Sequence, residues 1–145
     1  MPAKTSTLCD VITRECVAVR VRRLGRLVTG LYDRALRPLG LKVSQLNILV
    51  AAGKLGVAQP LAVCRALELD ASTLSRNVDR MMAKGWLEVA PIADGRAQPF
   101  RLTPSGHRLV ERAFPAWERA QKKARELLGS DGLRALIATM KQPGT

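Results

Sequence analysis

The first regular hydrophobic pattern of the chain lies in residues 11–37. Apolar side chains recur there at alternating spacings of four and three residues, which places them on one face of a helix. Pro38 and Gly40 then end the helix. We therefore predict one long helix over 11–37 whose apolar stripe is made of Val17, Val21, Leu24, Val28, Leu31 and Ala35.

Three shorter helices are expected next. Ser44 is suited to cap the first of them, and Pro60 fits the first turn of the second. Asp70 is an N-cap residue for the third, which ends at Gly85. A short helix, a tight turn and a further helix over residues 60–85 form the order of a helix-turn-helix, whose second helix enters the DNA major groove.

The pattern becomes strand-like after Gly85. Residues 86–92 and 97–102 are predicted to form a β-hairpin around a turn at 93–96. Pro99 cannot donate a ladder hydrogen bond, so we expect it at an edge or a bulge.

A long helix is predicted to close the chain. Thr103 is its expected cap, with a proline at the first helical position, and its apolar spacing continues to Leu128. Pro115 should kink this helix. The sequence Gly-Ser-Asp-Gly at 129–132 should break it before a short final helix.

The length of 145 residues predicts one domain, over 1–145. The fold class is mainly α with a small β-hairpin wing. We expect a winged helix-turn-helix over 43–103, with long helices in 10–42 and 104–145 on either side.

The helix over 70–84 has two distinct faces. Leu74, Val78, Met81 and Met82 cluster within about a third of its circumference and should face the core. Serine, threonine and arginine side chains that point outward can reach phosphates and bases. The candidate DNA contacts are Ser72, Thr73, Ser75, Arg76 and Arg80. A solvated structural helix shows a similar outer face, so this pattern alone leaves both interpretations open.

The tip of the predicted hairpin carries the sequence Asp94-Gly95-Arg96. An arginine at a wing tip can enter the minor groove, where a narrow groove concentrates negative potential. A phosphate would repel Asp94, so its expected role is to position an arginine. A solvated turn with no partner is the alternative.

The net charge indicates the class of partner that the chain would bind. The chain has 24 Lys+Arg and 12 Asp+Glu, a formal charge of +12, which favours a polyanion such as double-stranded DNA. Residues 1–42 carry +6 of this charge, and residues 70–108 only +2. No uncharged stretch approaches the ~20 residues that cross a bilayer, and the N-terminus does not resemble a signal peptide. We therefore expect a cytoplasmic protein and no membrane partner.

Metal, cofactor and enzyme functions are not expected. Cys9 and Cys16 are seven residues apart in a predicted helix, about 10 Å along its axis, which is too far for one tetrahedral zinc. Neither Cys64 nor the single histidine, His107, supplies a ligand pair. The sequence also lacks a nucleophile paired with a base and a glycine-rich phosphate loop.

Residues 70–106, DASTLSRNVDRMMAKGWLEVAPIADGRAQPFRLTPSG, resemble the MarR family of winged helix-turn-helix regulators. The matching elements are Asp70 with Ser72-Thr73-Leu74, Val78-Asp79-Arg80-Met81, Gly85, Asp94-x-Arg96 and Leu102-Thr103-Pro104-x-Gly106. The resemblance implies a homodimer with intertwined first and last helices, which represses transcription at a pseudo-palindromic site until an effector or an oxidant releases it. It also implies that Arg76 contacts DNA from the recognition helix and that Arg96 does so from the wing.

Two positions depart from the family pattern, and two further functions stay open. Glu68 stands where the family often has glycine, and Cys64 fits a core position. Cys16 could make the chain a redox-sensing regulator, and a winged helix can also serve as a protein–protein interaction module without DNA binding. Cationic side chains in the first helix, namely Arg22, Arg23 and Arg26, form a candidate effector site for a small anionic ligand.

Overall fold

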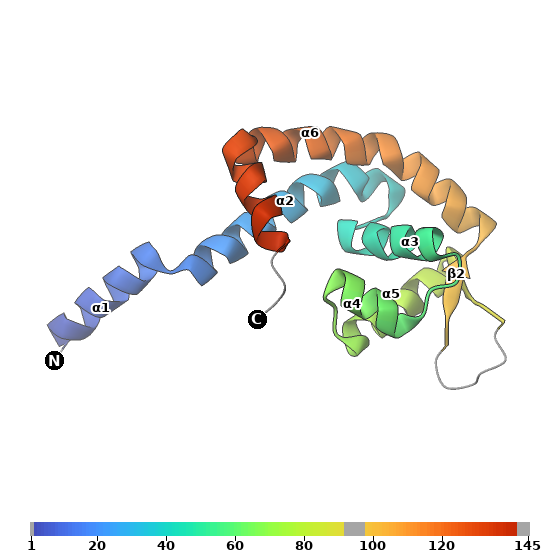
Figure 1. The fold of residues 1–145 in the computed structure, drawn as a ribbon, viewed down its shortest axis with the longest axis horizontal. Coiled ribbons are helices and arrows are strands. Elements are labelled where there is room, and N and C mark those ends of the chain that lie inside the picture. Colours follow the sequence, from blue (N-terminus) through green and yellow to red (C-terminus); the bar gives the residue numbers. More distant parts are fainter. Residues whose placement is uncertain (1, 92–97, 142–145) are drawn as a thin grey trace.

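Two long helices pack side by side above a cluster of short helices and a two-stranded sheet (Figure 1). The computed structural model describes residues 2–91 and 98–141. The elements are α1 (Pro2–Glu15), α2 (Val17–Leu36), the 3-10 turn η1 (Arg37–Leu39), α3 (Val43–Leu55), α4 (Pro60–Leu67), α5 (Ala71–Ala83), β1 (Leu87–Val89), β2 (Phe100–Leu102) and α6 (Pro104–Met140).

The core lies between α3, α4, α5 and the sheet, and the C-terminal end of α2 and the N-terminal part of α6 complete it. The strands β1 and β2 are antiparallel, and Leu87 pairs with Leu102. Leu74, Val78 and Met81 are buried on α5, which confirms the predicted inner face of this helix. The largest fully buried side chains are Leu36, Ile48, Leu49, Val63, Met81 and Phe100. This small core fixes the orientation of α5.

Of the predicted N-caps Thr103 and Ser44, the structure contains only Thr103. The Thr103 hydroxyl accepts a hydrogen bond from the Gly106 N–H at 3.0 Å, as expected. Ser44 does not cap α3, because this helix begins one residue earlier, at Val43. The first turn of α3 is held instead by a carboxylate from α2, since Asp33 Oδ1 accepts a hydrogen bond from the Val43 N–H at 2.8 Å.

The prediction of one helix over 11–37 is wrong. The chain forms two helices, and Cys16 between them has an extended ψ of 111°. The Arg20 guanidinium donates to the carbonyl oxygens of Arg14 and Glu15. A cation bound to the last carbonyls of a helix stabilises its C-terminus, so this side chain favours the end of α1 at Glu15.

The break predicted near the end of the last helix is confirmed at Gly129. Its φ of 68° and ψ of 171° are the non-helical backbone angles within α6, and Figure 1 shows the chain turning sharply near this end. Pro115 does not interrupt α6 in this way.

The long helices α2 and α6 meet through small side chains. Ala113, Ala116, Ala120 and Ala124 are buried on α6. The Tyr32 hydroxyl donates to the Gln121 side-chain oxygen. Burial raises the pKa of Tyr32, partly opposed by the positive charge of Arg125. This contact holds the two helices in register.

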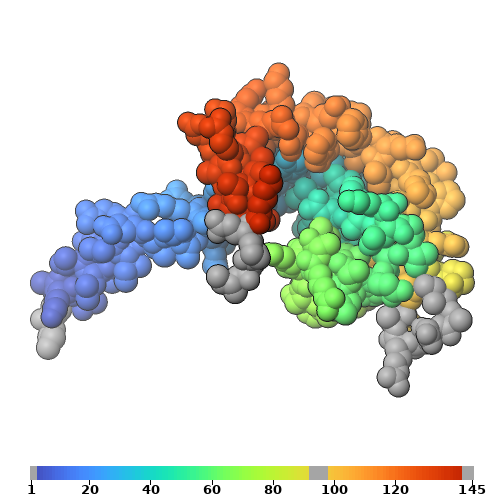
Figure 2. All heavy atoms as spheres, viewed as in Figure 1, coloured from blue at the N-terminus to red at the C-terminus, as the bar shows by residue number. Residues whose placement is uncertain are grey.

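The N-terminal part of the molecule extends away from the core. In Figure 2, α1 and the first half of α2 project from the remaining helices. Their large apolar side chains are exposed, as are several near the end of α6: Leu8, Ile12, Val17, Val21, Leu27, Leu136, Ile137 and Met140. The described part of the chain therefore leaves an apolar surface uncovered.

Candidate nucleic-acid interface

The outer face of α5 is the centre of the candidate interface. Ser72, Ser75, Arg76 and Arg80 are exposed on it, and Thr73 is half-buried. The side chains of Ser75, Arg76 and Arg80 form no hydrogen bond or ion pair with residues 2–91 and 98–141. These three side chains are therefore free to bind a partner.

Asp70 organises the first turn of α5. Its carboxylate accepts from the Thr73 N–H at 2.7 Å, the Ser72 hydroxyl at 2.6 Å and the Thr73 hydroxyl at 2.8 Å. These bonds, led by the one from Ser72, hold the pKa of Asp70 well below its usual range, and the Arg76 charge adds to the effect.

The same contacts change the role expected of the two hydroxyls. Each hydroxyl has a single proton, and in this structure Ser72 and Thr73 donate theirs to Asp70. They can accept a hydrogen bond from a base, but they must leave Asp70 before they can donate to a phosphate. The periodicity of the sequence does not reveal this internal cap.

The turn before α5 has a left-handed backbone, and contacts of Lys84 hold the end of α5. Glu68 has a φ of 51°, in the left-handed region that favours glycine. At the other end, the Lys84 ammonium donates to the Gly40 carbonyl at 3.2 Å and lies 4.6 Å from the Trp86 ring centroid. The hydrophobic pattern does not mark Lys84, and the only signal for its role in the sequence is a lysine two residues before a tryptophan, a cation beside an aromatic ring.

The wing is held by an ion pair on its surface. Arg101 Nε lies 2.7 Å from Glu88 Oε1, and this contact connects β2 to β1. Pro99 precedes β2, and its carbonyl accepts from the Ala90 N–H at 2.8 Å. The predicted wing-tip residues Asp94 and Arg96 lie outside the described residues.

The arginines expected to form an effector site lie on one helix. Arg22, Arg23 and Arg26 line an open hollow of about 510 Å³ together with Ala18 and Val19, all from α2. No second element closes this hollow in the described part of the chain.

The cysteines are apart from one another. Cys16 is half-buried between α1 and α2, Cys9 is exposed on α1, and Cys64 packs against the core from α4. Within residues 2–91 and 98–141, no group of three or more His, Cys, Asp or Glu side chains is arranged to hold a metal. None of the helices described is both long and apolar enough to span a bilayer.

The helix-turn-helix of α4 and α5, followed by the β1–β2 hairpin, defines a winged-helix fold. Comparison with known proteins agrees: residues 39–97 match the model of the MarR family. The multiple antibiotic resistance protein MarR of Salmonella typhimurium is 31% identical over an alignment of 96 residues, which covers 61% of this chain and 67% of that protein.

Two solved structures show the same fold over nearly the whole chain. The DNA complex of the Mycobacterium tuberculosis transcriptional regulator MOSR is 30% identical, with a TM-score of 0.76 over 87% of this chain and 93% of that one. Bordetella bronchiseptica BpsR, whose DNA binding is regulated by 6-hydroxynicotinic acid, is 24% identical, with a TM-score of 0.76 over 88% and 97%. The chain belongs to the MarR family of transcriptional regulators.

Proposed function

We propose that this regulator is a homodimeric, sequence-specific repressor that a small-molecule effector releases from its operator. The observation that carries the proposal is the outer face of α5, where Arg76 and Arg80 are exposed without a partner in the described residues. A rigid helix that presents free guanidinium groups is suited to the major groove.

The uncovered apolar surface supports the homodimer. Apolar side chains along α1, α2 and the end of α6 are exposed in one chain, and a second copy would bury them. We assign residues 10–42 and 104–145 to dimerisation and 43–103 to DNA binding, within a single domain. Two α5 helices about 34–36 Å apart would then fit successive major grooves of a pseudo-palindromic site.

Each predicted contact has a distinct task in this proposal. Arg76 is exposed on the outer face of α5, and we assign it to a bidentate contact with guanine. We assign Ser75 and Arg80 to phosphates, together with Ser72 and Thr73 once they release Asp70. From the wing, Arg96 would enter the minor groove, with Asp94 positioning it.

The effector is proposed to be a small organic anion. BpsR, a relative with the same fold, responds to an aromatic carboxylic acid. The cationic side chains of α2 offer a complementary charge, and Arg22, Arg23 and Arg26 line an open hollow there. Repression would end when the ligand favours a dimer geometry that no longer fits the operator.

Substitution of Arg76 tests the DNA-binding proposal. DNA fragments selected from random sequence by the purified protein would give the operator, and titration would give its affinity and that of random DNA. Arg76→Ala should weaken operator binding by about 5- to 150-fold, the equivalent of one bidentate base contact of ~1–3 kcal/mol. Binding to random DNA should change far less.

Arg76→Lys separates a base contact from a phosphate contact, because lysine keeps the charge but loses the planar fork. A base contact predicts that this variant also loses operator specificity. Equal losses on operator and random DNA for Arg76→Ala, with recovery in Arg76→Lys, would assign Arg76 to a phosphate. Failure to select any sequence would contradict sequence-specific binding.

A further inference from the structure

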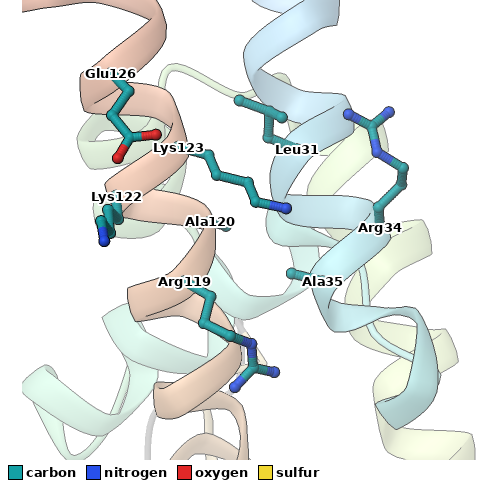
Figure 3. Close-up of a pocket in the computed structure, with 8 residues that line it drawn as sticks. All are labelled: Leu31, Arg34, Ala35, Arg119, Ala120, Lys122, Lys123 and Glu126. Carbon is teal, nitrogen blue, oxygen red and sulfur yellow. The ribbon is translucent and has the colours of Figure 1, made fainter.

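A cationic groove lies between the two long helices. It follows the open hollow along α2, and Arg34, which lines the groove, also borders a shallow pocket with Arg23 and Arg26. Figure 3 shows Leu31, Arg34 and Ala35 on the α2 side and Arg119, Ala120, Lys122, Lys123 and Glu126 on the α6 side. The cavity has a volume of about 500 Å³. Unlike the open hollow, it has a wall on each of two helices.

The charge of this groove is not balanced by the described chain. Four cations and one carboxylate give its lining a net charge of +3. The ion pairs within residues 2–91 and 98–141 are Arg101–Glu88 and Arg134–Asp131, so none of the four cations has a carboxylate within 4 Å there. Cations held near one another repel, and a bound anion would remove that repulsion.

The base of the groove is apolar and open. Ala35 and Ala120 have short side chains where the helices face each other, and Leu31 adds an apolar wall. Lys123 extends its ammonium across the space from α6 towards α2 (Figure 3). An anion with an apolar body would therefore find charge at the rim and apolar surface beneath it.

The groove does not belong to the DNA-binding face. It lies between the long helices, whereas α4, α5 and the hairpin are on the other side of α3 (Figure 1). The charge of its lining, +3, exceeds the +2 of residues 70–108, which contain the recognition helix and wing. Contact between α5 and DNA does not explain this accumulation.

We propose that the groove between α2 and α6 binds a small organic dianion, of the dicarboxylate class. One carboxylate would be held by Arg119 and Lys123 from α6, and the other by Arg34 from α2. The carbon skeleton would lie on Leu31 and Ala120. Two carboxylates would reduce the net charge of the groove from +3 to +1.

The position of the groove also suggests how a ligand would act on DNA binding, a step that rests on the proposed function. Arg34 follows Asp33, whose carboxylate accepts from the Val43 N–H at the start of α3. Tyr32, one residue earlier, contacts Gln121 of α6. A dianion that draws α2 and α6 together would move Asp33. Because Asp33 holds the start of α3, the position of the helix-turn-helix would change as well.

The experiment measures ligand binding to the full chain without DNA. Titration calorimetry would use three dicarboxylates (isophthalate, phthalate and adipate), with the neutral isophthalamide and inorganic phosphate as controls. At least one dicarboxylate should bind and raise the melting temperature, while isophthalamide does not. The double variant Arg119→Gln/Lys123→Gln should lose tenfold or more in affinity.

Arg112→Gln is the matched control, because it removes a positive charge from an exposed position of α6 outside the groove. It should bind the dicarboxylate like the unmodified protein. The proposal is overturned if no dicarboxylate binds, if phosphate binds equally well, or if the double variant keeps its affinity. It is also overturned if the double variant weakens the dimer, since a partner subunit would then be the occupant.

A separate titration of operator DNA with the bound dicarboxylate tests the coupling. Weaker DNA binding that is absent in Arg119→Gln/Lys123→Gln would support release by this site. Unchanged DNA affinity would contradict coupling but not the site. If the chain binds no DNA at all, the proposed function fails, while calorimetry still decides whether the groove binds a dianion.

Discussion

Gly106 is the position where α6 begins against the hairpin, and it cannot accept a side chain. A Cβ atom at this position would lie 2.1 Å from the Trp86 carbonyl oxygen and 3.1 Å from a methyl group of Leu102. Ordinary carbon–oxygen contacts are about 3.3–3.6 Å. Gly106→Ala therefore requires backbone atoms to move by at least about 1 Å.

That movement would disturb several bonds at once. The Trp86 carbonyl accepts from the Thr103 N–H at 3.1 Å. The Thr103 hydroxyl donates to the Gly85 carbonyl at 2.6 Å and accepts from the Gly106 N–H. Overpacking costs about 1–3 kcal/mol, and each weakened hydrogen bond adds up to about 1 kcal/mol. The helix propensity of alanine returns about 1 kcal/mol, which offsets the loss of one such hydrogen bond, so the overpacking remains and we expect a net destabilisation of about 1–3 kcal/mol.

Urea and thermal unfolding, followed by circular dichroism, measure this effect. A loss of that size lowers the melting temperature by roughly 3–10 °C for a chain of this length. Gly25→Ala is the matched control, because nothing lies within 4 Å of its added Cβ. It should stabilise the protein by about 0.4–1 kcal/mol. If Gly106→Ala is as stable as the unmodified chain, the contact between α6 and Trp86 is incorrect.

Three further predictions concern the helix-turn-helix and the wing. Glu68→Gly should raise the free energy of unfolding in urea by up to about 1 kcal/mol, because glycine relieves the left-handed backbone; a loss would show that the Glu68 side chain stabilises the fold. Asp70→Ala should destabilise the protein at pH 7 and clearly less at pH 2, because the ionised carboxylate is lost only well below the usual range for an aspartate. The lowered pKa of Asp70 means that its stabilisation is complete above the unfolded value of ~3.9, and that it disappears only as the pH falls through the much lower pKa of the folded state. An equal loss at both pH values in thermal unfolding would contradict an ionic cap. Glu88→Gln should cost less than about 1 kcal/mol in urea, because both side chains of the Glu88–Arg101 pair are 45% exposed; a larger loss would show that the pair is structural.

The features that the sequence predicts well are those determined by near neighbours. The inner face of α5 follows from periodicity because one side of a helix must meet the core. Asp70 and Thr103 cap their helices because an N-cap side chain reaches N–H groups only two or three residues away. Glu68 stands where the resemblance to the family puts glycine, and its backbone is left-handed.

The features that sequence analysis missed depend on longer-range contacts. At the break, the Arg20 side chain donates hydrogen bonds to the carbonyl oxygens of Arg14 and Glu15. The spacing of apolar residues over 11–37 gives no information about such a polar contact. The contact at the start of α3 comes from Asp33, ten residues before its partner Val43.

The groove depends on contacts at still greater separation. Arg34 and Arg119 share it although 84 residues lie between them in the sequence. The sequence does contain one indication of the groove: Arg119 and Lys123 are four residues apart, which places two cations on one face of α6. Only the packing of α2 on α6 shows that this face meets a third cation.

Polar contacts at the segment between α2 and α3 join the long helices to α5, the helix that we propose binds DNA. From one side, Asp33 of α2 holds the Val43 N–H. From the other, Lys84 at the end of α5 holds the Gly40 carbonyl and lies over Trp86. A shift of α2 therefore acts on the start of α3 and, through Gly40, on the end of α5. A ligand between α2 and α6 can change the orientation of α5 only if it binds one position of α2 more tightly than another. The size of its effect on DNA binding is therefore limited by the difference between these two ligand affinities, and not by the overall affinity of the ligand.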